Sequence, residues 1–225
     1  MLKRQLSTEE LIEILVSQNR AIPSRTMAIQ GLLLGLGGMA AVYFILSLGP
    51  ARTDLRMLTA DPPFLIPVAT SALIWLTGVA ALFFLRAPQG SGRWLLLPIG
   101  ATVLWLAVEI AGVIADLSSD GSAAFAFASS PECPLAIIGL GAAALLALLF
   151  FVRDAVRLWK VPAIGVAAAA AASLPASLLN LFHSLDTAAM VLLWHGVTVG
   201  TMTATVMLVA RRRFRRPIAD GRVSP

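Results

Sequence analysis

Long runs of apolar residues alternate with short polar segments along almost the whole chain. Six of these runs reach the length of a membrane-spanning helix, because about 20 apolar residues cross the ~30 Å hydrocarbon core of a bilayer. The polar segments between the runs are too short to fold as domains. The pattern predicts an all-α, polytopic membrane protein with six transmembrane helices. The expected spans are 26–48, 64–85, 94–115, 134–152, 162–182 and 187–210.

The composition of the chain supports the membrane class. Apolar residues make up 58% of the 225 positions and charged residues only 13%, about half the charged fraction of a soluble domain. A net charge of +5 is also found in proteins that bind nucleic acid, but here the basic residues border the apolar runs. That placement is typical of membrane topology and of contact with anionic lipid headgroups. We therefore expect a lipid bilayer as partner and no direct nucleic-acid binding.

Lys and Arg gather in the two terminal segments and in every second loop, which together hold fifteen of these residues against two in the remaining loops. Basic loops stay in the cytoplasm, so both termini are expected there. Three regions follow: a cytoplasmic N-terminal segment at 1–25, a six-helix membrane domain at 26–210 and a basic cytoplasmic tail at 211–225.

The N-terminal segment contains the pattern of a short amphipathic helix over residues 8–18. Residues 7–10 read Ser-Thr-Glu-Glu, the spacing of a capping box that begins a helix. Leu11, Ile14 and Leu15 then form an apolar stripe at helical spacing. A helix this short is marginal in water without a surface to pack on. The residues leave open whether that surface is the membrane, the inner loops of the bundle or another protein, although the acidic polar face disfavours anionic lipid.

The order of features along the whole chain resembles one known family. The matching segments are TEELIEIL at 8–15, RTDLRMLTADPPFL at 52–65, SSPECPLAIIGL at 129–140, FVRDAVRLWKVPAIGVAAAAAASLPASLLNLFHS at 151–184 and LLWHGVTVG at 192–200. In their order, their spacing and their position relative to the loops, they resemble the NrsF-like family of bacterial six-span membrane anti-sigma factors.

The resemblance implies a membrane-bound inhibitor of an extracytoplasmic-function sigma factor in the bacterial inner membrane. In such families the cytoplasmic N-terminal segment captures the sigma factor, and an envelope signal releases it. Carried over to this chain, the partner-binding residues would be Glu10, Leu11, Ile14 and Leu15. The sequence does not indicate which sigma factor is bound, what the signal is, or the oligomeric state.

One expected feature of the family is incomplete in this sequence. The family pattern commonly has two cysteines on the outward side, and Cys133 matches the first. Ser184, which follows His183, stands where the family favours the second. A thiol pair can form a disulfide or bind a soft metal, whereas a lone thiol can do neither within one chain. Cys133, His183 and Ser184 are the candidates for signal sensing, with an intermolecular disulfide or direct modification of the thiol left open. The alternative is that Cys133 is only a small residue at a helix start.

The residues also leave other functions open as alternatives to sigma-factor binding. Glu109, His183 and His195 are weak candidates for a metal site, because ionisable groups inside spans often serve a function; each could instead only hydrogen-bond across helices. A small transporter or channel component is one alternative function, and a metal-dependent membrane enzyme is another. The sequence contains no P-loop, HExxH or dinucleotide-binding motif, so we expect no enzyme and no cofactor.

Small residues indicate where the spans approach one another. Gly31 and Gly35 lie four residues apart, as do Gly196 and Gly200, and residues 167–172 are all Ala. Such patterns permit close contact between helix backbones in a membrane. We therefore expect helix–helix interfaces at all three places.

Overall fold

The structure is a computed structural model of the 225-residue chain. It describes residues 7, 9, 24–47, 54, 57, 62–86, 91–125, 132–182 and 187–214. Within these residues, all regular secondary structure is helical. The long helices are α2 (Ser24–Ser47), α4 (Pro62–Leu85), α5 (Leu96–Asp120), α6 (Glu132–Phe151), α7 (Arg153–Leu179) and α9 (Val197–Phe214). The short elements are the 3₁₀ turns η1 (Gly92–Leu95) and η2 (Gly121–Phe125), α8 (Ala188–Val191) and the π-helical turn η3 (Leu192–Gly196).

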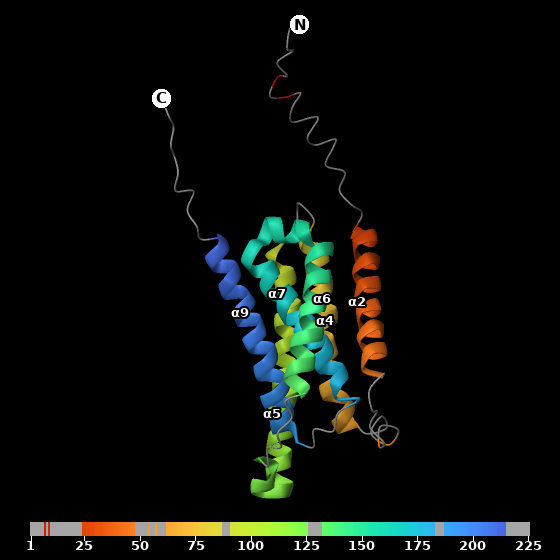
Figure 1. Cartoon of the computed structure of the whole chain (residues 1–225), viewed down its shortest axis with the longest axis vertical. Coiled ribbons are helices and arrows are strands. Elements are labelled where there is room, and N and C mark those ends of the chain that lie inside the picture. Colours follow the sequence, from red (N-terminus) through yellow and green to blue (C-terminus); the bar gives the residue numbers. More distant parts are fainter. Residues whose placement is uncertain are drawn as a thin grey trace.

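The helices agree with the expected spans. Six helical stretches are long and apolar enough to cross a membrane, the last of them formed by α8, η3 and α9 together. They run up and down as a bundle, so Ser24 at the start of α2 and Phe214 at the end of α9 lie at the same end (Figure 1). We call this the basic end, because the Lys and Arg residues at the helix termini gather there, and we call the other the opposite end.

Helix α7 forms the centre of the bundle and packs against α2, α4, α6 and α9. Its alanine run is mostly buried, as expected from the small side chains. A Cβ added at Gly78 of α4 would lie 2.7 Å from the Cβ of Ala170, and one at Gly141 of α6 would lie 3.2 Å from the Cα of Ala172. Glycine and alanine thus let three helix backbones approach closely.

Large apolar side chains cover the outside of the bundle. Leu33 is 66% exposed and Leu146 is 71% exposed, and many other leucine, isoleucine and phenylalanine residues face outward in the same way. Soluble monomers rarely expose contiguous apolar surface of this extent. This is the surface that a lipid-facing bundle needs.

The segment 153–160, which the sequence assigns to a loop, is helical in the structure. Residue Lys160 has φ 37° and ψ −111° and divides α7 into a short helix at the basic end and the long central helix. Pro162 follows two residues later and lacks the N–H that an unbroken helix would use there. The loop prediction is therefore corrected to a short helix followed by a kink.

Candidate functional site

The predicted partner-binding residues Glu10, Leu11, Ile14 and Leu15 lie outside the described residues. The predicted helix over 8–18 lies outside them too, apart from Glu9, which is exposed. The first described span, α2, begins at the basic end of the bundle. The role of the N-terminal segment in binding a partner therefore stays a prediction.

Among the described residues, cations from three segments, 86–93, 153–160 and 211–213, lie at the basic end. The described ones are Arg86, Arg93, Arg153, Arg157, Lys160, Arg211, Arg212 and Arg213. The Lys160 ammonium lies 5.8 Å from the centre of the Phe214 ring, which brings the kink of α7 next to the end of α9. The Arg93 guanidinium lies 5.6 Å from the Trp94 ring centre. Both are cation–π contacts that leave the charged groups near the surface.

Cys133 lies in the first turn of α6 and is fully buried. As the single cysteine of the chain it forms no intramolecular disulfide. A thiol that reacts readily is usually partly exposed in electropositive surroundings, so its burial favours the reading as a small packed residue. His183 and Ser184 lie outside the described residues, and their part in sensing stays a prediction.

At the opposite end, Asp116 ties α5 to the start of α8. Its carboxylate accepts a hydrogen bond from the Ala188 backbone N–H at 2.8 Å. A Cβ added at Gly112, one turn earlier in α5, would lie 2.8 Å from the Cβ of Ala188. The Thr187 hydroxyl caps the same helix start by accepting from the Met190 N–H. Asp116 therefore acts as a structural cap in this arrangement.

Glu109 is buried on α5, one helical turn after Trp105, and His195 is buried in η3. The Trp105 side chain hydrogen-bonds the Glu109 carboxyl, while Oε1 of that carboxyl has no hydrogen-bond partner among the described residues. Gly196, beside His195, packs on the Trp105 ring, which would lie 3.1 Å from an added Cβ. A π-helical turn such as η3 often marks a functional position in a helix.

These groups do not form a metal centre within the described part of the chain. There, no three His, Cys, Asp or Glu side chains gather closely enough to hold a metal ion. Glu109 and His195 are both placed, whereas His183 lies outside the described residues. The three-residue metal site therefore stays a prediction.

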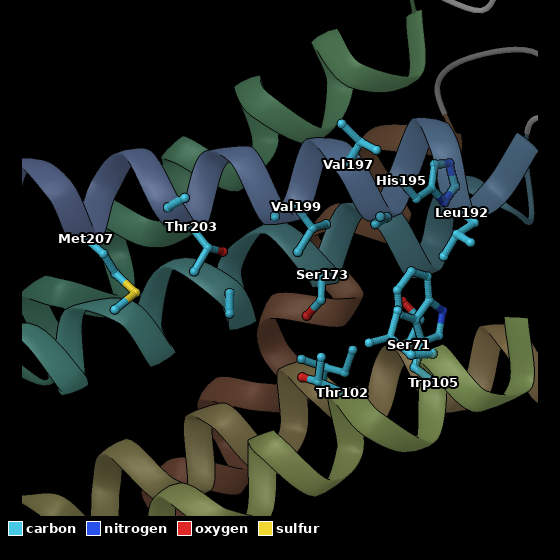
Figure 2. Close-up of a pocket in the computed structure, with 17 residues that line it drawn as sticks. Ser71, Thr102, Trp105, Ser173, Leu192, His195, Val197, Val199, Thr203 and Met207 are labelled. Carbon is cyan, nitrogen blue, oxygen red and sulfur yellow. The ribbon is translucent and has the colours of Figure 1, made fainter. Parts of the chain in front are cut away.

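A cavity of about 520 Å³ lies between α4, α5, α7 and α9 (Figure 2). Trp105 and His195 stand at one end of it and Met207 at the other. Its walls are mostly apolar, with the hydroxyl groups of Ser71, Thr102, Ser173 and Thr203 spread among them. Cavities of this size commonly hold small molecules. The polar groups are too scattered to form a reaction centre.

The cavity also corrects one expected interface. Gly196 packs closely on Trp105, but a Cβ added at Gly200 would meet nothing within 4 Å. Gly200 lines the cavity instead of a helix–helix contact. The predicted interface at these two glycines is therefore right for Gly196 and wrong for Gly200.

Comparison with known proteins identifies the family to which the chain belongs. The model of the family described as negative regulator of sigma F matches residues 15–215. The chain belongs to this family. The anti-sigma-F factor NrsF of Caulobacter vibrioides is 33% identical over 120 residues, which cover 51% of this chain and 53% of that protein. The chain thus aligns with about half the length of this relative. No solved structure matches the chain significantly.

The negative-regulator-of-sigma-F match includes all six helical spans but begins only at Leu15. Glu10, Leu11 and Ile14 precede it, so their role stays a prediction from the amphipathic pattern and the resemblance of the N-terminal segment. Sequence reasoning identified Glu109 and His195 as buried ionisable residues. It missed Trp105, which contacts Glu109 and Gly196, and the cavity, because neither leaves a periodic pattern in the sequence.

Proposed function

We propose that this protein is a membrane-bound anti-sigma factor that holds an extracytoplasmic-function sigma factor at the cytoplasmic face of the bacterial inner membrane. The observation that carries this proposal is the family match across residues 15–215. The six apolar helices supply the membrane anchor. The N-terminal segment supplies the binding element, with Glu10, Leu11, Ile14 and Leu15 as its contact residues.

The charge distribution supports this orientation. With the basic end in the cytoplasm, the N-terminal segment precedes α2 on the side where the sigma factor is found. The acidic residues of the predicted helix, including Glu10, would complement the basic surface that a sigma factor uses to grip DNA phosphates. Leu11 and Leu15 would bury their side chains against the partner, which a short helix needs in order to be stable.

The proposal is tested by placing a charge on the apolar stripe. Leu11→Asp and Leu15→Asp should each weaken co-purification of the sigma factor with the full-length membrane protein and raise transcription of its target genes. Burial of one leucine contributes about 1.5–3 kcal/mol, so binding should fall by roughly tenfold or more.

Ser17→Asp is the matched control, because it adds the same charge on the face of the predicted helix that carries Glu10 and Glu13. It should leave sigma-factor binding almost unchanged. If both leucine variants bind the sigma factor as the wild type does, the N-terminal helix is not the binding element. If all three variants lose binding equally, the loss is caused by a negative charge added anywhere on the helix. The apolar stripe then has no special role in sigma-factor binding.

Release on an envelope signal is part of the same proposal. A signal at the opposite end of the bundle would reach the N-terminal segment through the packed spans. No observation on the described residues favours a transporter or a metal-dependent enzyme over this function.

A further inference from the structure

A second cavity, of about 350 Å³, continues the first toward the basic end. Thr102, Ala169 and Met207 line both cavities. The second reaches Leu95 at the end of η1 and Pro162 just after the kink of α7. Together the two cavities make one groove from His195 to Leu95, which we call the lateral groove.

The lateral groove opens sideways between α5 and α9. Among the described helices, α5 packs on α4 and α8 but makes no extensive contact with α9. Leu106, Gly200 and Ala204 line the groove and are exposed on the outside of the bundle. In a membrane this opening faces lipid acyl chains.

The length of the groove matches one leaflet of a bilayer. From Leu95 at the basic end to Trp105 the axis of α5 rises about 15 Å at 1.5 Å per residue. Half of the ~30 Å hydrocarbon core is about 15 Å. A single acyl chain that enters from the basic end would therefore reach from the headgroup level to Trp105.

Cations surround the end where the headgroup would lie. Arg93 precedes Leu95 by two residues, Lys160 precedes Pro162 by two, and Arg211 follows Met207 by one helical turn. All three cations are exposed, and they come from η1, α7 and α9, each of which also contributes a residue to the wall of the groove at this end. Basic sites between spans on the cytoplasmic side bind anionic lipid headgroups.

We propose that the lateral groove is a binding site for an anionic phospholipid of the cytoplasmic leaflet. One acyl chain lies between α5, α7 and α9, and the headgroup phosphate lies among Arg93, Lys160 and Arg211. The walls of the groove would accept the acyl chain of any lipid. The preference for an anionic phospholipid therefore comes from the contact between its headgroup and the cations. This inference rests on the membrane insertion proposed above and is independent of sigma-factor binding.

The test uses full-length protein in phosphatidylcholine bilayers that contain a trace of lipid with a photoactivatable acyl chain. The probe is phosphatidylglycerol in one sample and phosphatidylcholine in the other, and labelled peptides are mapped by mass spectrometry. The phosphatidylglycerol probe should label the segment 197–207 of α9 several times more than the phosphatidylcholine probe does. Equal labelling of this segment by the two probes would overturn the headgroup selectivity.

Gly200→Leu should fill the groove, because an added Cβ there meets nothing within 4 Å. Labelling of α9 should then fall several-fold, and Ala204→Leu should act in the same way. Gly139→Leu on α6 is the matched control, since it too has open space around the Cβ but lies away from the groove. Unchanged labelling in both groove variants would overturn the site.

The charge is tested by Arg93→Gln together with Arg211→Gln. Phosphatidylglycerol labelling should fall several-fold, toward the level of the phosphatidylcholine probe, because the attraction of the headgroup to these cations is lost, while phosphatidylcholine labelling stays as it was. Arg153→Gln with Arg157→Gln removes the same charge elsewhere at the basic end and should have a much smaller effect. If a photoactivatable fatty acid displaces the phospholipid at equal concentration, the occupant is a free fatty acid and the proposal is wrong.

Failure of membrane insertion would look different from failure of the site. An inserted bundle is labelled by either probe on the outward faces of α2 and α6, whose leucines are exposed. Without that labelling the insertion itself is wrong. Where it is present, labelling of the α9 segment decides the site.

Discussion

At the scale of single residues, burial separates the polar groups that build the fold from those that could respond to a signal. Asp116 and Thr187 are hydrogen-bonded to the first turn of α8, so their task is to hold two elements together. Glu109 has a buried carboxyl oxygen with no partner among the described residues. A buried polar atom without a partner is costly, and this makes Glu109 the first described ionisable residue to examine for a functional role.

Cys133 gives a prediction at this scale. Because its side chain is fully buried, a maleimide should label it in native membranes more than about tenfold more slowly than an exposed cysteine, since reaction requires local opening of the bundle. The reference is Ser122→Cys in a Cys133→Ser background, as Ser122 is exposed in η2. Equal labelling rates for Cys133 and the exposed cysteine at position 122 would show that Cys133 is accessible. Cys133 would then again be a candidate for signal sensing.

At the scale of elements, the small residues of α4 and α7 decide how closely the central helices pack. Trp75 of α4 reaches across to α2 and donates a hydrogen bond from its indole N–H to the Gly35 carbonyl at 2.8 Å. An added Cβ at Gly35 would lie 3.1 Å from Leu76. The interface expected from Gly31 and Gly35 is therefore confirmed, with an additional hydrogen bond that the sequence pattern does not indicate.

Gly78→Val tests the contact between α4 and α7, where an added Cβ at Gly78 would lie 2.7 Å from the Cβ of Ala170. The new side chain would collide with Ala170, and overpacking of a core costs about 1–3 kcal/mol. The apparent unfolding temperature of the detergent-solubilised protein should fall by several degrees. Gly37→Val on α2 is the control, because its added Cβ meets nothing within 4 Å. If the unfolding temperature fell equally in both variants, the cause would be helix propensity and not the α4–α7 contact.

The same elements show what sequence can and cannot predict. Apolar length predicted the six helices, since spanning a bilayer imposes a minimum length, but α5 ends five residues after the expected 115 and α7 begins nine residues before the expected 162. The kink at Lys160 was missed because the basic residues of 153–160 indicated a border and carried no information on backbone conformation. The lateral groove was missed because it depends on the divergence of α5 from α9, and Gly200 looks the same in sequence whether it packs or lines a cavity.

At the scale of the whole molecule, the two ends of the bundle differ in chemistry. The basic end holds the start of α2, the end of α9 and the cations between them. The opposite end holds Asp116, Asp120 and Glu132. This asymmetry bears on both proposals, because the sigma factor and the anionic headgroup are each expected at the basic end.

Topology reporters test this arrangement directly. A fluorescent protein that matures only in the cytoplasm should be active when fused after Arg216, and an alkaline phosphatase that folds only outside should be active when inserted at Ser122. The physical reason is that moving the basic segments, which hold fifteen of the seventeen Lys and Arg residues, across the membrane is strongly disfavoured. Exchanging the two reporters gives the control, and both should then be inactive. If the exchanged pair is the active one, the basic end faces outward, and the N-terminal segment would have no access to a sigma factor.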